Sequence, residues 1–249
     1  MNRRLKDLLY SPNSVLEALR AKGRQIYRIQ IAAGIQEKGR ISEIIKSAED
    51  RSIKIERVPK QRLDKIHSGH QGVVAEADGY TYAELLDILE AARAKNEHPF
   101  ILILDSLQDP QNFGSLIRTA EALGVHGVVI PLAHTVAVTP VVVNASSGAS
   151  EYLAIARSNI AQVLDALKNE NIWRVGLDQA GEEIGDHAHR HLKGPLCLVV
   201  GSEGEGLRQL VRSKCDILLK LPMVGRIESL NAAVAGSVAL YLAYFARKS

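Results

Sequence analysis

Residues 100–131 read FILILDSLQDPQNFGSLIRTAEALGVHGVVIP and set the pattern for the larger part of the chain. FILILD at 100–105 is almost wholly apolar, as expected of a strand covered on both faces. A helix is predicted over about 113–123, where Gly124 ends it, and VHGVVIP at 125–131 is the next strand. This strand–helix–strand order predicts a parallel α/β sheet.

The same alternation continues toward the C-terminus. A helix is predicted over 159–170, and short apolar strands over 173–177, 196–200 and 217–221. The chain has 249 residues, which is enough for two modest domains, and its 46% hydrophobic and 24% charged residues are typical of a soluble globular protein.

The helix that begins near Asn112 combines an amide, a guanidinium and a free helix start. Asn112 is predicted as the N-cap, and Arg118 points away from the apolar stripe formed by Leu116, Ala120 and Leu123. Free N–H groups at a helix start, together with an arginine, form a ready anion site. Spacing alone equally allows a capped structural helix with a solvent-facing arginine.

The second motif is GSEGEG at 201–206, which follows an apolar strand. Its glycines allow the backbone to approach a ligand closely or to adopt positive φ. The pattern is neither G-x-G-x-x-G nor a P-loop, and Glu203 and Glu205 would repel phosphates, so a neutral or cationic ligand fits better. A purely structural turn is the alternative.

The third motif is LPMVGRIESLN at 221–231, which leads into a slim, alanine-rich helix. Residues 230–246 contain no charged side chain. These 17 residues fall short of the roughly 20 needed to span a bilayer, and they include polar side chains, so we predict a buried helix without a membrane role.

Residues 1–77 are predicted to form a separate small α+β domain. Ser14 and Glu17 have capping-box spacing before a short helix. The remaining predicted elements are strands at 25–32 and 53–58, a helix at 41–48, and a final strand within 63–77.

Residues 78–97 are predicted to connect the two domains through a helix over 81–95. Thr81 and Glu84 provide its capping-box spacing. The second domain then covers 98–249.

Positive charge is concentrated in the N-terminal third. Residues 1–80 hold 16 lysines and arginines against 10 acidic residues, whereas residues 81–249 hold 15 against 18. This asymmetry favours a basic module that binds phosphate. The alternative is a solvated basic surface without a partner.

Taken together, the three motifs resemble those of the SpoU (TrmH-type) family of S-adenosylmethionine-dependent RNA ribose 2′-O-methyltransferases. They occur here as Asn112-x-Gly114-x-x-x-Arg118-Thr119-Ala120, Gly201-x-Glu203-x-x-Gly206-Leu207, and Pro222-Met223-x-Gly225 with Ser229-Leu230-Asn231. Residues 1–77 also resemble the L7Ae/L30e-like substrate-binding domain found in many members. Within the family, the chain is most similar to RlmB-type 23S rRNA guanosine methyltransferases.

The resemblance implies a parallel sheet with a C-terminal trefoil knot, a homodimer, and S-adenosylmethionine bound in the knot. It implies cofactor contacts at Gly201, Gly206, Leu221, Met223 and Leu230. It also implies catalytic or substrate roles for Arg118, Asn112, Glu203, Ser229 and Asn231.

The implied reaction is attack of a ribose 2′-oxygen on the sulfonium methyl group. A hydroxyl is a weak nucleophile and needs activation. The family's proposed base is the arginine matching Arg118, but a guanidinium scarcely deprotonates in proteins. We therefore expect Arg118 to hold the neighbouring phosphate and to stabilise negative charge. Proton removal then falls to Glu203, to the phosphate or to water.

These features predict a cytoplasmic enzyme that acts on rRNA. A tRNA ribose methyltransferase and a non-catalytic RNA-binding assembly factor are the alternatives. Cys197 and Cys215 lack CxxC spacing, which agrees with a reducing compartment.

No metal site is predicted. His187, His189 and His191 in DHAHRH do not have a usual zinc spacing.

Overall fold

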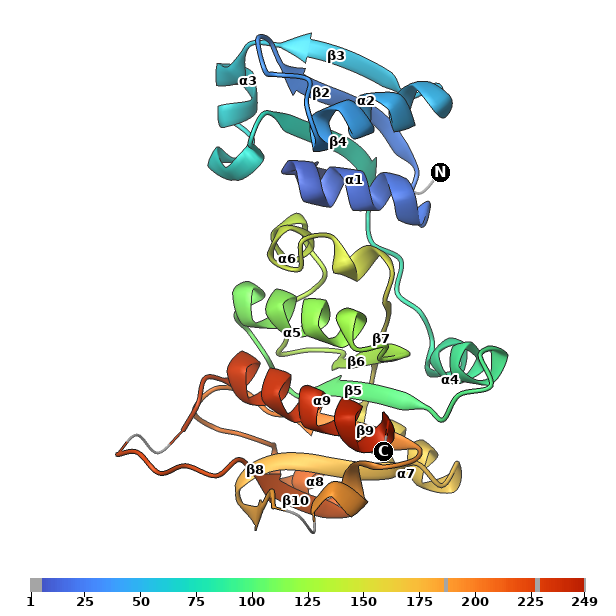
Figure 1. Cartoon of the computed structure of the whole chain (residues 1–249), viewed down its shortest axis with the longest axis vertical. Helices are drawn as coiled ribbons and strands as arrows, with labels where there is room; N and C mark the ends of the chain where they lie inside the picture. The colour runs from blue at the N-terminus through green and yellow to red at the C-terminus, as the bar shows by residue number, and fades with distance from the viewer. Residues whose placement is uncertain (1–5, 186–187, 227–228, 249) are drawn as a thin grey trace. The chain divides into compact units, whose positions relative to one another are not determined.

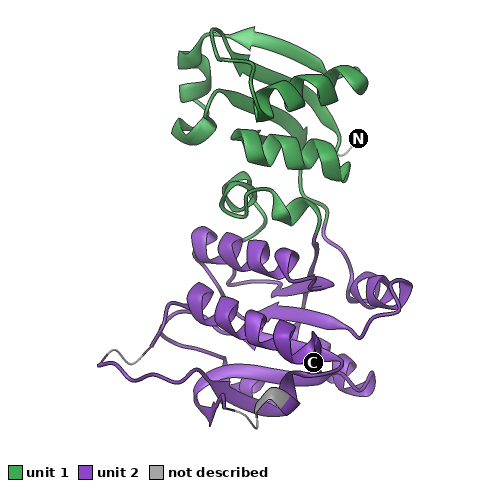
Figure 2. Cartoon of the chain, viewed as in Figure 1, with its two compact units in different colours: residues 1–81, 137–152 green, residues 82–136, 153–249 purple. Residues whose placement is uncertain are grey.

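The computed structural model describes residues 6–185, 188–226 and 229–248. The chain divides into two compact units (Figure 2). The first unit consists of Met1–Thr81 and Ala137–Tyr152, and the second of Tyr82–Val136 and Leu153–Ser249. The division therefore differs from the expected boundaries, because residues 137–152 group with the N-terminal residues rather than with the rest of 98–249.

The first unit contains a four-stranded mixed sheet in the order β1-β4-β2-β3 (Figure 1). β2 and β3 pair in parallel, and β4 runs antiparallel to both β1 and β2. Its elements are β1 (Lys6–Tyr10), α1 (Pro12–Ala21), β2 (Ile26–Ala32), α2 (Arg40–Asp50), β3 (Lys54–Val58), α3 (Lys60–Asp64) and β4 (Val73–Asp78).

Residues 137–152 join this unit through a buried ion pair. They contain the short helix α6 (Pro140–Ala145) and a 3-10 turn at Ala149–Glu151. The Glu151 carboxylate accepts two hydrogen bonds of 2.9 Å from Arg24, whose side chain is only 3% exposed. Because a buried charge requires a partner, this pair ties the segment to the N-terminal residues.

Two predicted capping boxes are wrong. α1 begins at Pro12 with Ser11 as N-cap, so Ser14 lies buried inside the helix. Proline at the first helical position starts the helix earlier than the predicted serine would.

The connecting helix also starts later than predicted. α4 spans Leu85–Ala94, and its capping box is formed by Glu84 and Asp87 rather than by Thr81 and Glu84. Residues 81–84 instead form an extended approach, in which Ala83 makes a parallel bridge to Ala156.

The second unit is built on a six-stranded sheet in the order β10-β8-β9-β5-β6-β7, and every neighbouring pair is parallel. The predicted parallel α/β fold is thus confirmed. The strands are β5 (Phe100–Leu104), β6 (Gly127–Pro131), β7 (Ala154–Ser158), β8 (Trp173–Glu183), β9 (Leu196–Val200) and β10 (Ile217–Lys220). In addition to α4, this unit contains the helices α5 (Pro110–Ala122), α7 (Ile160–Asn169), α8 (Gln209–Ser213) and α9 (Ala232–Lys248).

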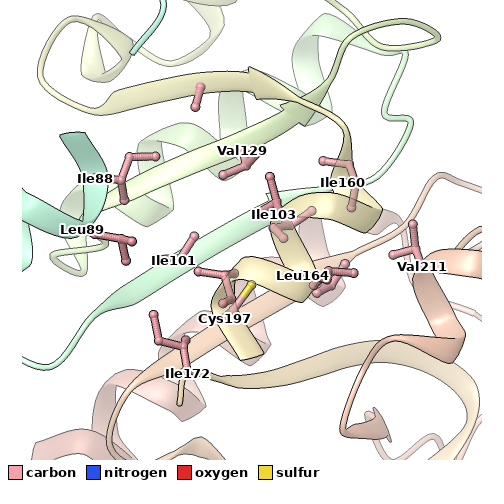
Figure 3. Close-up of a cluster of buried hydrophobic side chains, with 14 of the residues drawn as sticks. Ile88, Leu89, Ile101, Ile103, Val129, Ile160, Leu164, Ile172, Cys197 and Val211 are labelled. Atoms are coloured by element: carbon pink, nitrogen blue, oxygen red, sulfur yellow. The ribbon is translucent and has the colours of Figure 1, made fainter. Parts of the chain in front are cut away.

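The core of this unit lies between the sheet and the helices that follow its strands. Figure 3 shows Ile101 and Ile103 of β5 and Cys197 of β9 facing Ile160 and Leu164 of α7. All five side chains are at most 2% exposed. Strands buried in this way read as continuous apolar runs, which is why β5 and β9 were predictable.

The final helix is buried on one face only. α9 lies beside α5 (Figure 1), and the hydroxyls of Ser237 and Thr119 are 3.0 Å apart. The prediction of a buried helix is wrong for the opposite face, where Tyr241 and Phe245 are 49% and 59% exposed. Within the described ranges, no helix is long and apolar enough to cross a membrane.

Candidate active site

The three motifs follow three strands of the parallel sheet. The stretch leading into α5 comes after β5, the glycine loop (residues 201–208) comes after β9, and residues 221–231 come after β10. Because the strands are parallel, their carboxyl ends meet at one edge, where α/β proteins usually bind ligands.

Asn112 does not cap α5, which corrects the prediction. The N-cap is Asp109, whose side chain accepts a 2.9 Å hydrogen bond from the Gln111 amide, and Pro110 is the first helical residue. Asn112 is the third residue of the helix. Its side chain is therefore available for contacts beyond α5.

Asn112 and Asn231 hold the carboxylate of Glu203, and we call these three residues the carboxylate–amide trio. The Asn112 amide donates to Glu203 Oε1 at 2.7 Å. The Asn231 amide donates both to Asn112 Oδ1, at 3.0 Å, and to Glu203 Oε1. One residue from each motif thus meets at a single point, although 91 to 119 positions separate Asn112 from the other two.

Asn231 also fixes the start of α9. Its Oδ1 accepts hydrogen bonds from the amides of Ala233, at 2.9 Å, and Val234, at 3.2 Å. This is the N-cap arrangement, so the side-chain oxygen anchors the helix while the amide group reaches the trio.

The glycine loop closes on itself through its backbone. Ser202 and Gly206 exchange main-chain hydrogen bonds of 3.0 and 3.1 Å. A Cβ atom at Gly201 would lie 2.2 Å from the carbonyl carbon of Gly206, so no larger residue fits there without a shift. Gly206 has φ +67°. The sequence is glycine-rich because the turn itself requires it.

The other predicted site residues lie in the segment after β10 or farther along α5. Arg118 lies on the exposed side of α5, six residues after Asn112. Leu221 is partly buried, and Met223 and Leu230 are both 40% exposed. Ser229 is exposed beside Asn231, and residues 227–228 lie outside the described chain.

Residues 221–226 suit a small ligand that is held mainly by main-chain groups. They belong to no helix or strand, so their amides and carbonyls are not committed to a regular ladder. The half-exposed side chains of Met223 and Leu230 add apolar surface at the same segment. Main-chain donors and acceptors together with apolar side chains fit a planar heterocycle such as adenine.

Sequence reasoning missed Asp105 and Arg208. Asp105 follows β5 directly and is fully buried, and its carboxylate accepts a 2.8 Å hydrogen bond from Arg208 Nε. An acidic residue at the end of an apolar strand was a usable signal, because buried charges need partners.

The cysteines do not contribute nucleophiles. Burial raises the pKa of the Cys215 thiol to about 12, and burial also raises the pKa of Cys197 well above its usual range. Neither forms a thiolate at neutral pH.

The histidines were not predicted to bind metal. His187 lies outside the described residues, and His191 stacks on Trp173 with 5.8 Å between ring centroids. In the described part of the chain, no three histidine, cysteine or acidic side chains are grouped to hold a metal ion.

The fold and the converging polar groups define a parallel α/β protein with a candidate ligand site at the carboxyl edge of its sheet. Residues 99–241 match the model of the SpoU rRNA Methylase family, and residues 8–83 match the RNA 2′-O ribose methyltransferase substrate-binding model. The chain belongs to the SpoU family, whose methyl donor is S-adenosylmethionine, in agreement with the prediction.

Similar proteins agree with this assignment. YacO of Bacillus subtilis (strain 168), named for the TrmH family of tRNA/rRNA methyltransferases, is 45% identical over 240 residues, covering 96% of this chain and 95% of its own. A TrmH family relative from Staphylococcus aureus (strain MSSA476) is 41% identical over 231 residues, covering 92% of each. The SpoU methyltransferase AviRb of Streptomyces viridochromogenes, solved with AdoMet, has a TM-score of 0.78 at 25% identity, covering 98% of this chain and 91% of AviRb.

Proposed function

We propose that this enzyme transfers the methyl group of S-adenosylmethionine to a ribose 2′-hydroxyl of a guanosine in 23S rRNA, in the cytoplasm. The convergence of Asn112, Glu203 and Asn231 at the carboxyl edge of the sheet carries the proposal. The bound donor supplies an electrophilic methyl group. Gly201, Gly206, Leu221, Met223 and Leu230 hold the donor, largely through main-chain groups.

The remaining site residues act on the ribose and its phosphate. Both amides of the trio donate to Oε1 of Glu203, which leaves Oε2 to accept the proton of the 2′-hydroxyl. Arg118 holds the adjacent phosphate and stabilises developing negative charge. Ser229 precedes the trio's Asn231 by two residues and contacts the substrate.

The decisive experiment separates substrate contact from cofactor binding. Arg118→Ala should lower methylation by at least about 100-fold, as for the loss of a group that stabilises transition-state charge. The affinity for S-adenosylmethionine, measured by calorimetry, should stay within about twofold. Arg93→Ala, which removes another exposed arginine of the same unit, is the matched control. Loss of cofactor binding in Arg118→Ala would contradict the assigned role.

The choice of RNA is tested with the wild-type enzyme on undermodified 23S rRNA and on tRNA. The tRNA alternative has support from the names of the relatives, which cover both RNAs. However, a structure described by 2-OH methylation of C/U34 on tRNA matches only 59% of this chain, and the family model that matches residues 99–241 is named for rRNA. Methylation of tRNA alone would overturn the rRNA assignment, and binding of RNA and donor without turnover would favour the assembly-factor alternative.

We propose that the first unit binds RNA at the carboxyl ends of β2 and β3, near a cavity of about 400 Å³. Ala32, Ala33, Gly34, Ile35, Lys60, Ser68, His70, Gln71 and Gly72 line it. Lys38, Arg62 and Lys65 are exposed nearby in sequence, and in the described residues they form no ion pair. They remain available to contact phosphates.

The face of the β1–β4 sheet that carries Lys6, Arg28 and Lys54 is less suited to RNA, because these basic side chains already form ion pairs with acidic side chains of the same sheet. Lys6 and Arg28 both contact Glu76, and Lys54 contacts Glu56 at 2.8 Å. Lys60→Glu with Lys65→Glu should weaken RNA binding and reduce the slope of log affinity against log salt by about 1 to 2. Lys54→Glu is the control, and equal slopes in all three proteins would remove this surface from the proposal.

We propose that a second copy of the chain covers the exposed face of α9. Val234, Val238, Tyr241 and Phe245 recur every three or four residues along that face and are 40–59% exposed. A continuous apolar stripe of this kind marks an interaction surface. Light scattering should show a dimer that Phe245→Asp converts to a monomer. A monomeric wild type would refute the proposal that a second copy covers α9.

The family resemblance also supports a trefoil knot in the C-terminal segment. Asn231 returns to contact residues of both earlier motifs, as threading would require. A knotted chain should refold slowly from denaturant, because threading precedes the final packing. Single-phase refolding in milliseconds would argue against the knot.

A further inference from the structure

Asp105 contacts both ends of the glycine loop. Its main-chain amide donates a 2.8 Å hydrogen bond to the carbonyl of Val200, the residue before the loop. Its carboxylate accepts hydrogen bonds from the main-chain amide of Arg208, at 3.1 Å, and from Arg208 Nε, at 2.8 Å. One residue at the end of β5 therefore fixes where the loop leaves β9 and where it ends.

The burial of Asp105 makes its contact with Arg208 costly to break. Its side chain is fully buried, whereas that of Arg208 is 48% exposed. A buried carboxylate is stable only with charged or hydrogen-bonding partners, and Arg208 supplies both a guanidinium and a main-chain amide. If the loop end left Asp105, the buried carboxylate would lose its charged partner and would keep only a long hydrogen bond of 3.4 Å from Ser106 Oγ.

The loop transmits this constraint to Glu203. Ser202 and Gly206 close the turn at its base, and Glu203 lies inside that turn, where the two asparagines hold it. Fixing the ends of so short a loop limits the positions available to the residue between them.

We propose that Asp105, through Arg208, is a positioning residue for the methyl donor and for Glu203. This inference rests on the proposed role of the glycine loop in holding the cofactor. Asp105 itself touches neither substrate nor donor.

The sheet contains a matched control at its other end. Asp216, which precedes β10, accepts hydrogen bonds from the main-chain amide of Arg174, at 2.9 Å, and from Arg174 Nε, at 2.8 Å. The same pair of donors meets the same kind of acceptor, but at the amino ends of β8 and β10, away from the glycine loop.

The test compares Asp105→Asn with Asp216→Asn. Asp105→Asn should raise the Kd for S-adenosylmethionine by at least about tenfold and lower kcat, while the Kd for 23S rRNA stays within about twofold. Asp216→Asn should lower the melting temperature but leave both Kd values and kcat near those of the wild type. Arg208→Ala, an exposed substitution that retains the main-chain amide, should raise the cofactor Kd by about three- to tenfold, and Arg208→Lys by less.

The outcomes separate this inference from the proposed function. If the wild type neither binds the donor nor methylates RNA, the proposed function fails. If the wild type does both but the Asp105 and Asp216 variants change cofactor binding equally, Asp105 is merely structural and the inference fails. Should Asp105→Asn not fold, Arg208→Ala decides, and a cofactor Kd equal to that of the wild type overturns the proposal.

Discussion

The two ends of the six-stranded sheet use polar groups in different ways. At the amino ends, Arg174 pairs with Asp216, and the Nδ1 atom of His126 accepts a 3.0 Å hydrogen bond from the Phe100 amide. At the carboxyl ends, Glu203 and Asn231 meet on exposed segments. The same strands thus support a closed, paired edge and an open edge with accessible polar groups.

This difference separates stability from chemistry. Paired groups at the amino ends fill their hydrogen-bonding capacity within the protein, so substitutions there should chiefly change the free energy of unfolding. Glu203 and Asn231 at the carboxyl ends remain accessible, so substitutions of these two residues should chiefly change cofactor binding and turnover.

The largest effect is expected from Gly201→Ala. The added methyl group would lie 2.2 Å from the carbonyl carbon of Gly206, so the turn would have to open. Methylation should fall by at least about 100-fold, equivalent to about 2.7 kcal/mol. Gly185→Ala is the control, because among the described residues no atom beyond its chain neighbours lies within 4 Å of the added Cβ. Wild-type kinetics in Gly201→Ala would show that the loop does not bind the donor.

Glu203→Ala should give the next largest effect. The carboxylate receives the amides of Asn112 and Asn231, and it lies on an exposed turn. We expect kcat to fall by about 10- to 100-fold, which is about 1.4–2.7 kcal/mol, while the melting temperature stays nearly constant. The matched control is Glu205→Ala, which removes the other exposed acid of the loop and should retain activity.

Arg247→Ala should have the opposite effect, with lower stability and unchanged cofactor binding. Its guanidinium donates to the carbonyls of His98, at 2.7 Å, and Gly194, and lies 4.8 Å from the Phe100 ring centroid, beside the amino end of β5. Losing these charged donors should lower the free energy of unfolding by about 2 kcal/mol without changing the cofactor Kd. Chemical denaturation measures the loss, and Lys248→Ala should cost less than about 0.5 kcal/mol.

The fold of the second unit could be predicted from the sequence more fully than its site. Continuous apolar runs predicted β5 and β9 because buried parallel strands have no polar face. β7 (AIARS) was not predicted, since five residues with a charge give too weak a period. The helix start at Asp109-Pro110 was readable, and it was overlooked in favour of Asn112.

The site could not be derived from spacing. Asn112, Glu203 and Asn231 lie far apart in the sequence, and only the order of strands in the sheet brings them together. The resemblance to a family pointed to them, whereas periodicity did not. The exposed stripe of α9 could not be predicted from the sequence either, because a helix that is apolar on all sides does not show which face is covered.

The smallest expected effect concerns pH and the amino end of β5. Desolvation by burial lowers the pKa of His126, whose Nδ1 must stay unprotonated to accept the Phe100 amide. Below its ordinary pKa of about 6.5, the unfolded chain binds a proton more readily than the folded one. This contribution to stability is therefore complete above that pH and is lost as the pH falls through the lowered folded-state pKa.

His126→Asn keeps an acceptor for the Phe100 amide but cannot titrate. Between about pH 7.5 and about pH 5.5, the wild type should lose more unfolding free energy than this variant, because only the wild type must keep His126 neutral. His98→Asn, which removes an exposed histidine next to the same strand, should follow the wild type. Parallel pH profiles for the wild type and His126→Asn would mean that this edge of the sheet is held by packing rather than by the neutral imidazole.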